Sequence, residues 1–96
     1  MKMDKKTSEF YERLREQLQE DTSWPSLYLY KFIVPAELSK IAEIRAVFDN
    51  TDAQITTRDS SGGKFTSVSV KVNMDSPDAV IEKYIEVSKV EGVISL

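Results

Sequence analysis

The chain has 96 residues, 41% of them hydrophobic, which is enough for a single domain with one modest core. Its 16 acidic and 13 basic residues give a net charge of -3, unlike the basic surface expected of a nucleic-acid-binding protein. It contains neither cysteine nor histidine, which excludes disulfides, thiol nucleophiles, the common catalytic triads and the usual zinc sites.

No apolar stretch approaches the about 20 residues needed to cross a bilayer. Residues 1–9 carry lysines with no apolar region behind them of the kind that a secretion signal requires. We therefore expect a cytoplasmic protein with no membrane partner.

An amphipathic helix is predicted between about residues 8 and 19. Phe10, Leu14 and Leu18 recur once per turn among charged and polar residues. Because this apolar stripe is narrow, we expect the helix to dock on the domain or on a second copy of the chain.

Residues 21–26 then predict a linker, in which Trp24 is expected to anchor against the domain edge. This divides the chain into an N-terminal helical extension with its linker, residues 1–23, and a domain over residues 24–96.

The first strand is predicted at residues 27–34, which are almost continuously apolar and rich in aromatic and β-branched side chains. Pro35 follows at a favoured first position of a helix. The helix should end near Asn50, a residue that adopts the left-handed conformation readily. Its expected buried stripe consists of Leu38, Ile41, Ile44, Val47 and Phe48.

A β-hairpin is the clearest local signal in the chain, because two alternating β-branched runs flank Ser60-Ser61-Gly62-Gly63. If these four residues form the loop, Asp59 pairs with Lys64 and Ile55 with Val68. The side facing the helices then holds Ala53, Ile55, Thr57, Thr66, Val68, Val70 and Val72.

A second domain helix begins at the best-marked start in the chain, with Ser76 as N-cap, Pro77 in the first turn and Asp78 complementing the helix dipole. Gly92 provides the stop, and residues 93–96 predict a short last strand. The apolar side of this helix consists of Val80, Ile81, Tyr84, Ile85 and Val87.

The order strand, helix, strand, strand, helix, strand predicts an α+β, ferredoxin-like βαββαβ sandwich. Its four-stranded antiparallel sheet should have the order 4-1-3-2 and carry two helices on one face, with the N-terminal amphipathic helix added.

The other face of the sheet is the candidate interaction face. On the first strand, alternation places Tyr28, Tyr30, Phe32 and Val34 toward the helices and Leu27, Leu29, Lys31 and Ile33 on the open side. The residues singled out for an interaction are Lys31, Arg58, Phe65, Ser67, Ser69 and Lys71. The alternative is that this side is only solvated, or is covered by Phe10, Leu14 and Leu18.

The hairpin segment SSGGKFTSVSV at 60–70, preceded by YLYKF at 28–32, resembles the YbeD-like family of small bacterial proteins of unknown function. The match continues into YIE at 84–86 and VISL at 93–96, so it covers about residues 24–96. The resemblance implies a ferredoxin-like domain similar to the ACT regulatory domains of amino-acid metabolism, with no catalytic residues to transfer. The long N-terminal helix departs from the family pattern.

The function favoured by these observations is a non-catalytic regulatory or protein-interaction module with a protein partner or a second copy of the chain. A small-metabolite ligand is the first alternative, although the connection after the first strand, Pro35-Ala36-Glu37, lacks the glycine needed for close backbone approach. RNA binding by the open face is the second alternative, and the acidic net charge argues against it. We expect no cofactor, no metal and no catalysis, because the paired acids near residues 50 and 76 have turn and cap explanations.

Overall fold

The computed structural model describes residues 5–96 and contains three helices and four strands in that range. The first four residues of the predicted N-terminal extension lie outside the described residues. In chain order the elements are α1 (Lys5–Asp21), β1 (Ser26–Pro35), α2 (Leu38–Val47), β2 (Gln54–Asp59), β3 (Phe65–Met74), α3 (Pro77–Ser88) and β4 (Ile94–Ser95).

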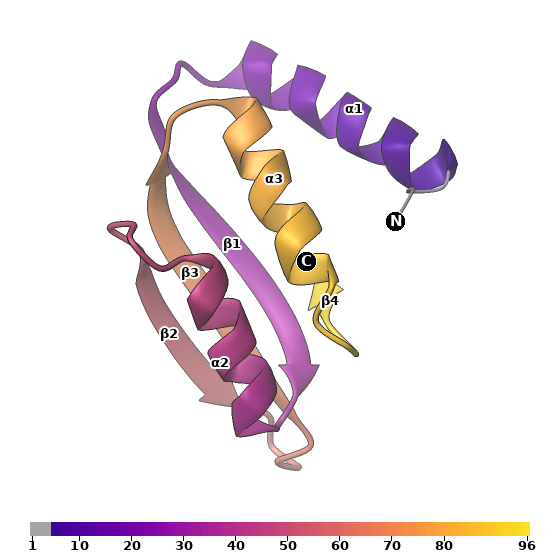
Figure 1. Ribbon diagram of the computed structural model, residues 1–96, viewed down its shortest axis with the longest axis vertical. Coiled ribbons are helices and arrows are strands. Elements are labelled where there is room, and N and C mark those ends of the chain that lie inside the picture. Colours follow the sequence, from indigo (N-terminus) through magenta and orange to yellow (C-terminus); the bar gives the residue numbers. More distant parts are fainter. Residues whose placement is uncertain (1–4) are drawn as a thin grey trace.

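The four strands form one antiparallel sheet in the order β2-β3-β1-β4, with α2 and α3 packed side by side on one of its faces (Figure 1). This confirms the predicted ferredoxin-like topology with an added N-terminal helix. The two long strands, β1 and β3, lie at the centre and pair along their whole length.

The core lies between the sheet and the two helices that cover it. On β1, Tyr30, Phe32 and Val34 are fully buried, and Val70 and Val68 lie opposite the first two on β3. The predicted phase of both strands is therefore confirmed, because alternate side chains of each strand point to the same face. The buried hydroxyl of Tyr30 donates a hydrogen bond of 3.0 Å to the Val80 carbonyl of α3.

The predicted hairpin register is wrong by two residues. Asp59 lies opposite Thr66 and Ile55 opposite Val70, whereas the loop was expected to pair Ile55 with Val68. Ser60 and Phe65 close the turn, since the Ser60 amide donates to the Phe65 carbonyl at 2.8 Å. A shift of two preserves the side chains on each face, so the face assignment of β3 survives the error.

The predicted start of α2 is also wrong, because Pro35 stays in β1 opposite Phe65. The Ala36 amide donates to the Lys64 carbonyl at 3.0 Å, which extends the strand-like contact beyond Pro35. The helix begins only at Leu38, and that side chain is 86% exposed instead of buried. Asn50 does adopt the left-handed conformation expected of it, with φ 63°.

The N-terminal helix does not cover the open side of the sheet. α1 packs against α3, as Figure 1 shows, and its Leu14 and Leu18 contact the core from the helical layer. Phe10, expected on the same stripe, is 57% exposed, while Tyr11 packs inward in its place. The alternative in which this helix shields Leu27, Leu29 and Ile33 is therefore wrong.

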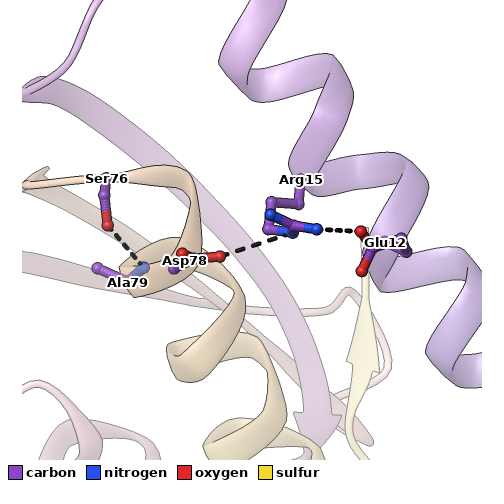
Figure 2. Close-up of polar contacts among 5 residues, drawn as sticks. All are labelled: Glu12, Arg15, Ser76, Asp78 and Ala79. Atoms are coloured by element: carbon purple, nitrogen blue, oxygen red, sulfur yellow. Dashed lines mark hydrogen bonds and ion pairs between the residues drawn. The ribbon is translucent and has the colours of Figure 1, made fainter.

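Two side-chain contacts attach α1 and its linker to the domain. Trp24 packs on the core edge as predicted, and its Nε1 donates to the Leu18 carbonyl at 3.2 Å. Figure 2 shows Arg15 of α1 between Glu12 and Asp78, with its Nε 3.6 Å from the Asp78 carboxylate. Asp78 lies in the first turn of α3, so this carboxylate serves both the helix dipole and the contact with α1.

The start of α3 gives a direct test of the predicted cap. Ser76 Oγ accepts a hydrogen bond of 3.1 Å from the Ala79 amide (Figure 2). We expect Ser76→Ala to lower the free energy of unfolding by about 1 kcal/mol, because the amide loses its partner. Urea denaturation measures the change, with Ser61→Ala in the exposed hairpin turn as the control. Equal effects of the two substitutions would contradict the cap.

Candidate interaction face

The side of the sheet that carries no helix is called the open face below. Alternation along β1, β2 and β3, together with the pairing of β4 on β1, determines which side chains lie on it. Its members are Leu27, Leu29, Lys31, Ile33, Pro35, Gln54, Thr56, Arg58, Phe65, Ser67, Ser69, Lys71, Asn73, Ile94 and Leu96.

The strand registers place the predicted residues in neighbouring rows across the sheet. One row runs Thr56, Ser69, Lys31 from β2 through β3 to β1. The next row runs Arg58, Ser67, Ile33. Directly opposite side chains in such rows have Cβ atoms about 4.5–5.5 Å apart, so the two cations flank a pair of serine hydroxyls.

The remaining two predicted residues lie on the same central strand, one on each side of these two rows. Lys71 is opposite Leu29, next to the Lys31 row, and Phe65 is opposite Pro35, next to the Arg58 row. All six predicted residues therefore lie on one continuous surface. Ser69 is half-buried and the other five are exposed.

Two open hollows adjoin on this surface. The first, of about 570 Å³, is lined mainly by polar residues and the two cations. The second, of about 530 Å³, lies toward the hairpin turn and contains the ring of Phe65. They share Ile33, Arg58 and Ser67, so a single bound segment could contact both.

The three cations of the open face have no ion-pair partner among residues 5–96. Asp59, an acidic residue at the end of β2, lies at the edge of the second hollow and accepts a hydrogen bond from the Thr66 hydroxyl at 3.1 Å. Asp52, just before β2, is held at the sheet edge by the side-chain and backbone amides of Asn73, at 2.6 and 3.2 Å. These hydrogen bonds lower the pKa of Asp52, the side-chain bond contributing most.

Ile94 and Leu96 are members of the open face that the sequence did not identify as site residues. Ile94 lies opposite Ile33, and the Leu96 amide donates to the Lys31 carbonyl at 2.9 Å. Their side chains are 53% and 68% exposed, and Leu96 lines the first hollow. Alternation cannot assign a face to a strand of two residues, so the pairing with β1 was needed to find them.

The connection between β1 and α2, considered above for a metabolite, is occupied by the protein itself. The Ala36 amide bonds to the hairpin turn, as described for the fold. A Cβ on Gly92 would lie only 2.9 Å from Cγ of Pro35, so the loop before β4 packs directly on this connection. These contacts leave little room there for a ligand to approach the backbone.

A separate cluster of tyrosines lies on the helical side of the sheet. The hydroxyls of Tyr28 and Tyr84 are 2.8 Å apart, and the ring of Tyr30 packs edge-on against both. Burial raises the pKa of Tyr30 and of Tyr84 well above the usual value, so both stay neutral even where an exposed tyrosine would ionise. The cluster therefore contributes packing and hydrogen bonds to the core.

Residues 5–96 lack the features of a membrane-spanning helix and of a metal site. In that range no helix is both long enough and apolar enough to span a bilayer. The same residues contain no group of three or more acidic side chains that could hold a metal ion.

The comparisons with known proteins agree with the resemblance seen in the hairpin. A family model described as "Protein of unknown function (DUF493)", a family that includes the YbeD-like proteins, matches residues 19–96. The match begins near the end of α1, so most of that helix lies outside it. No curated protein and no solved structure matches the chain.

Proposed function

Because the chain belongs to the DUF493 family of proteins of unknown function, we propose that it is a small non-catalytic module that binds another protein through its open face. The observation that supports this is a sheet face that no helix among residues 5–96 covers. On it, exposed apolar side chains lie near three cations that form no ion pair within the same residues. Apolar patches bordered by polar groups are typical of interaction sites. A regulatory role, in which binding changes the partner's activity, is the narrower form of the proposal.

The apolar part of the face is substantial. Leu27 and Leu29 are 53% and 58% exposed, and Phe65 is 45% exposed. An exposed sheet edge and an exposed apolar sheet face both promote unwanted association with other chains when the protein is unbound. Burial of these side chains under a partner would release about 25 cal/mol for each Å² of apolar surface removed from water.

The non-catalytic part of the proposal rests on the chemistry of the available side chains. Without histidine and cysteine, an acid/base pair would have to come from carboxylates, lysines or tyrosines. Asp52 is engaged by Asn73, and Asp78 by Arg15 and the start of α3. These carboxylates have structural roles away from the two hollows of the open face.

A photo-crosslinking experiment tests where the partner binds. Since the chain has no cysteine, Ser67→Cys on the open face and Ser39→Cys on α2 each create one attachment point for a benzophenone label. Both positions are exposed. In an extract of the source cells, we expect a discrete crosslinked protein from position 67 and none from position 39. The same products from both positions would contradict the proposed site.

A charge-reversal pair tests whether the cations of the open face take part in the crosslinked interface. Arg58→Glu with Lys71→Glu should abolish the crosslink from position 67. Arg45→Glu with Lys89→Glu changes the net charge equally at two exposed positions, one in α2 and one just after α3, and should leave the crosslink intact. Circular dichroism verifies that both double variants fold. If the crosslink persists after the charges of Arg58 and Lys71 are reversed, these cations are not part of the interface.

Self-association is the competing outcome, because a C2 dimer would bury the same face on both copies. Light scattering measures the mass of the purified chain before any extract is added. If two copies of the chain crosslink to each other at position 67, the partner on the open face is a second copy of the chain and not a separate protein.

A further inference from the structure

Building on the proposed function, we infer that the partner presents to the open face an acidic peptide segment in which a large apolar side chain adjoins a carboxylate. The two adjoining hollows differ in chemistry. The first holds two cations among hydroxyl groups, and the second holds the apolar side chains of Ile33 and Phe65 within a polar margin. Their common border at Ile33, Arg58 and Ser67 requires the two partner groups to be close together.

The first hollow has the donors that a carboxylate needs. Lys31 and Arg58 stand on either side of Ser69 and Ser67 in the two central rows of the face. Ammonium, guanidinium and hydroxyl groups all donate hydrogen bonds to a carboxylate, and charge-assisted bonds are roughly twice as strong as neutral ones. Thr56 adds another hydroxyl at the end of the Ser69 row.

Charge complementarity selects an acidic occupant over a neutral or basic one. Among residues 5–96, no side-chain carboxylate lines the first hollow, where Lys31 and Arg58 lie. Asp59 lies at the edge of the second hollow and accepts a hydrogen bond from Thr66, and Asp52 is bonded to Asn73 at the sheet edge. The chain is nevertheless acidic overall, and its helices carry most of the acidic residues. The open face is thus a local basic surface on an acidic protein, which favours an acidic partner and disfavours contact with basic surfaces.

The second hollow accounts for the apolar part of the segment. It contains Ile33 and the exposed ring of Phe65, with Asp59, Ser60 and Ser61 at its margin. Aromatic and aliphatic side chains that enter such a pocket provide much of the affinity of peptide interfaces. The Arg58 stem lies between the two hollows, where it can contact the apolar side chain while its guanidinium binds the carboxylate.

A peptide fits this surface better than a single-stranded nucleic acid does. Sheet faces that bind RNA stack successive bases on several aromatic rings. The open face offers Phe65 alone, because Tyr28, Tyr30 and Phe32 all point toward the helices. Three cations and one ring suit a short acidic segment with one large apolar residue.

The experiment uses a phage-displayed library of random peptides, selected on the immobilised full-length protein. We expect the enriched peptides to contain aspartate or glutamate next to leucine, isoleucine or an aromatic residue. The strongest peptide is then synthesised with a fluorescent label. Its dissociation constant should rise by about tenfold or more for Lys31→Glu with Arg58→Glu and stay unchanged for Arg45→Glu with Lys89→Glu.

Two further measurements separate the two hollows. Raising NaCl from about 50 to about 500 mM should weaken binding to the wild type, because screening reduces exposed charge contacts. Phe65→Ala should weaken binding while this salt dependence remains, since it removes only the apolar contact. Loss of salt dependence in Phe65→Ala would contradict the division of the two hollows.

The outcomes distinguish failure of this inference from failure of the proposed function. Enriched peptides that are neutral or basic, yet compete with the crosslink from position 67, would overturn the acidic segment and leave the open face as the binding site. Absence of any enriched peptide, or peptides that do not compete at position 67, would count against both. A single-stranded RNA pool that binds more tightly than the best peptide would overturn the inference in favour of a nucleic-acid partner.

Discussion

Replacing Ile44 by alanine is expected to lower the free energy of unfolding by about 2–5 kcal/mol, whereas Leu38→Ala should change it by less than about 0.5 kcal/mol. Both residues belong to α2 and both were expected on its buried stripe. Ile44 is completely buried, and Leu38 is 86% exposed. The first substitution leaves a cavity in the core, while the second removes a side chain that already lies in water.

The difference follows from the geometry of the helix. Each three-residue step turns back by about 60°, so the series 38, 41, 44 drifts around the axis and Leu38 lies about 120° from Ile44. Phe48, the C-cap residue of α2, lies only about 40° from Ile44 on the same projection, and it is also buried. Residues spaced three apart therefore do not form a straight stripe along a helix, and the first of them here, Leu38, lies outside the core.

Chemical denaturation followed by circular dichroism measures both variants in parallel. Small domains have about 5–15 kcal/mol of stability in total, so Ile44→Ala could remove a large share of it. Leu38→Ala serves as the matched control on the same helix. A comparable loss for both variants would contradict the orientation of α2.

The faces of the strands could be predicted from the sequence because they depend only on alternation. Tyr30 and Phe32 on β1, and Val68 and Val70 on β3, all point to the core as expected. The register could not be predicted in the same way. A shift of two residues leaves every side chain on its own face, so alternation does not distinguish the two registers. Which register forms depends on the residues that close the turn. The side-chain hydroxyl of Ser60, which accepts from the Phe65 amide at 3.2 Å, helps to make that choice.

The sequence predicted which residues belong to the candidate site but not how they lie relative to one another. Lys31 and Arg58 come from strands that do not touch each other, and only the position of β3 between them brings both beside Ser67 and Ser69. The position of α1 also decides whether the face is available at all. Its apolar stripe suits either side of the sheet, and its packing on α3 depends on tertiary contacts such as Arg15 with Asp78.

Gly92→Ala should be the most damaging of the three possible glycine substitutions, with a loss of about 2–5 kcal/mol in the free energy of unfolding. Gly92 has φ 82°, a conformation that costs a residue with a side chain about 1–2 kcal/mol. In addition, its Cβ would lie 2.9 Å from Cγ and 3.0 Å from Cδ of Pro35. The proline ring is rigid and belongs to β1, so the loop itself must move.

The other two glycines separate these two contributions. Gly63 has φ 70° but open space around its missing side chain, so Gly63→Ala should show the conformational cost of about 1–2 kcal/mol alone. At Gly62 no atom lies within 4 Å of the added Cβ, and its φ is not in the left-handed region. Gly62→Ala should therefore be neutral or stabilise the protein by up to about 1 kcal/mol.

Urea denaturation of the three variants gives the ranking, and a second readout connects Gly92 with the open face. The loop that contains Gly92 leads into β4, which places Ile94 and Leu96 beside Ile33 and Lys31. If the loop is displaced, these two apolar side chains should leave the open face. The Gly92→Ala protein should then bind the selected peptide less tightly than the Gly63→Ala protein. The two affinities are compared under conditions where both variants are folded. Equal stabilities for Gly92→Ala and Gly63→Ala would show that the contact with Pro35 does not constrain the loop. Equal affinities would show that β4 takes no part in binding.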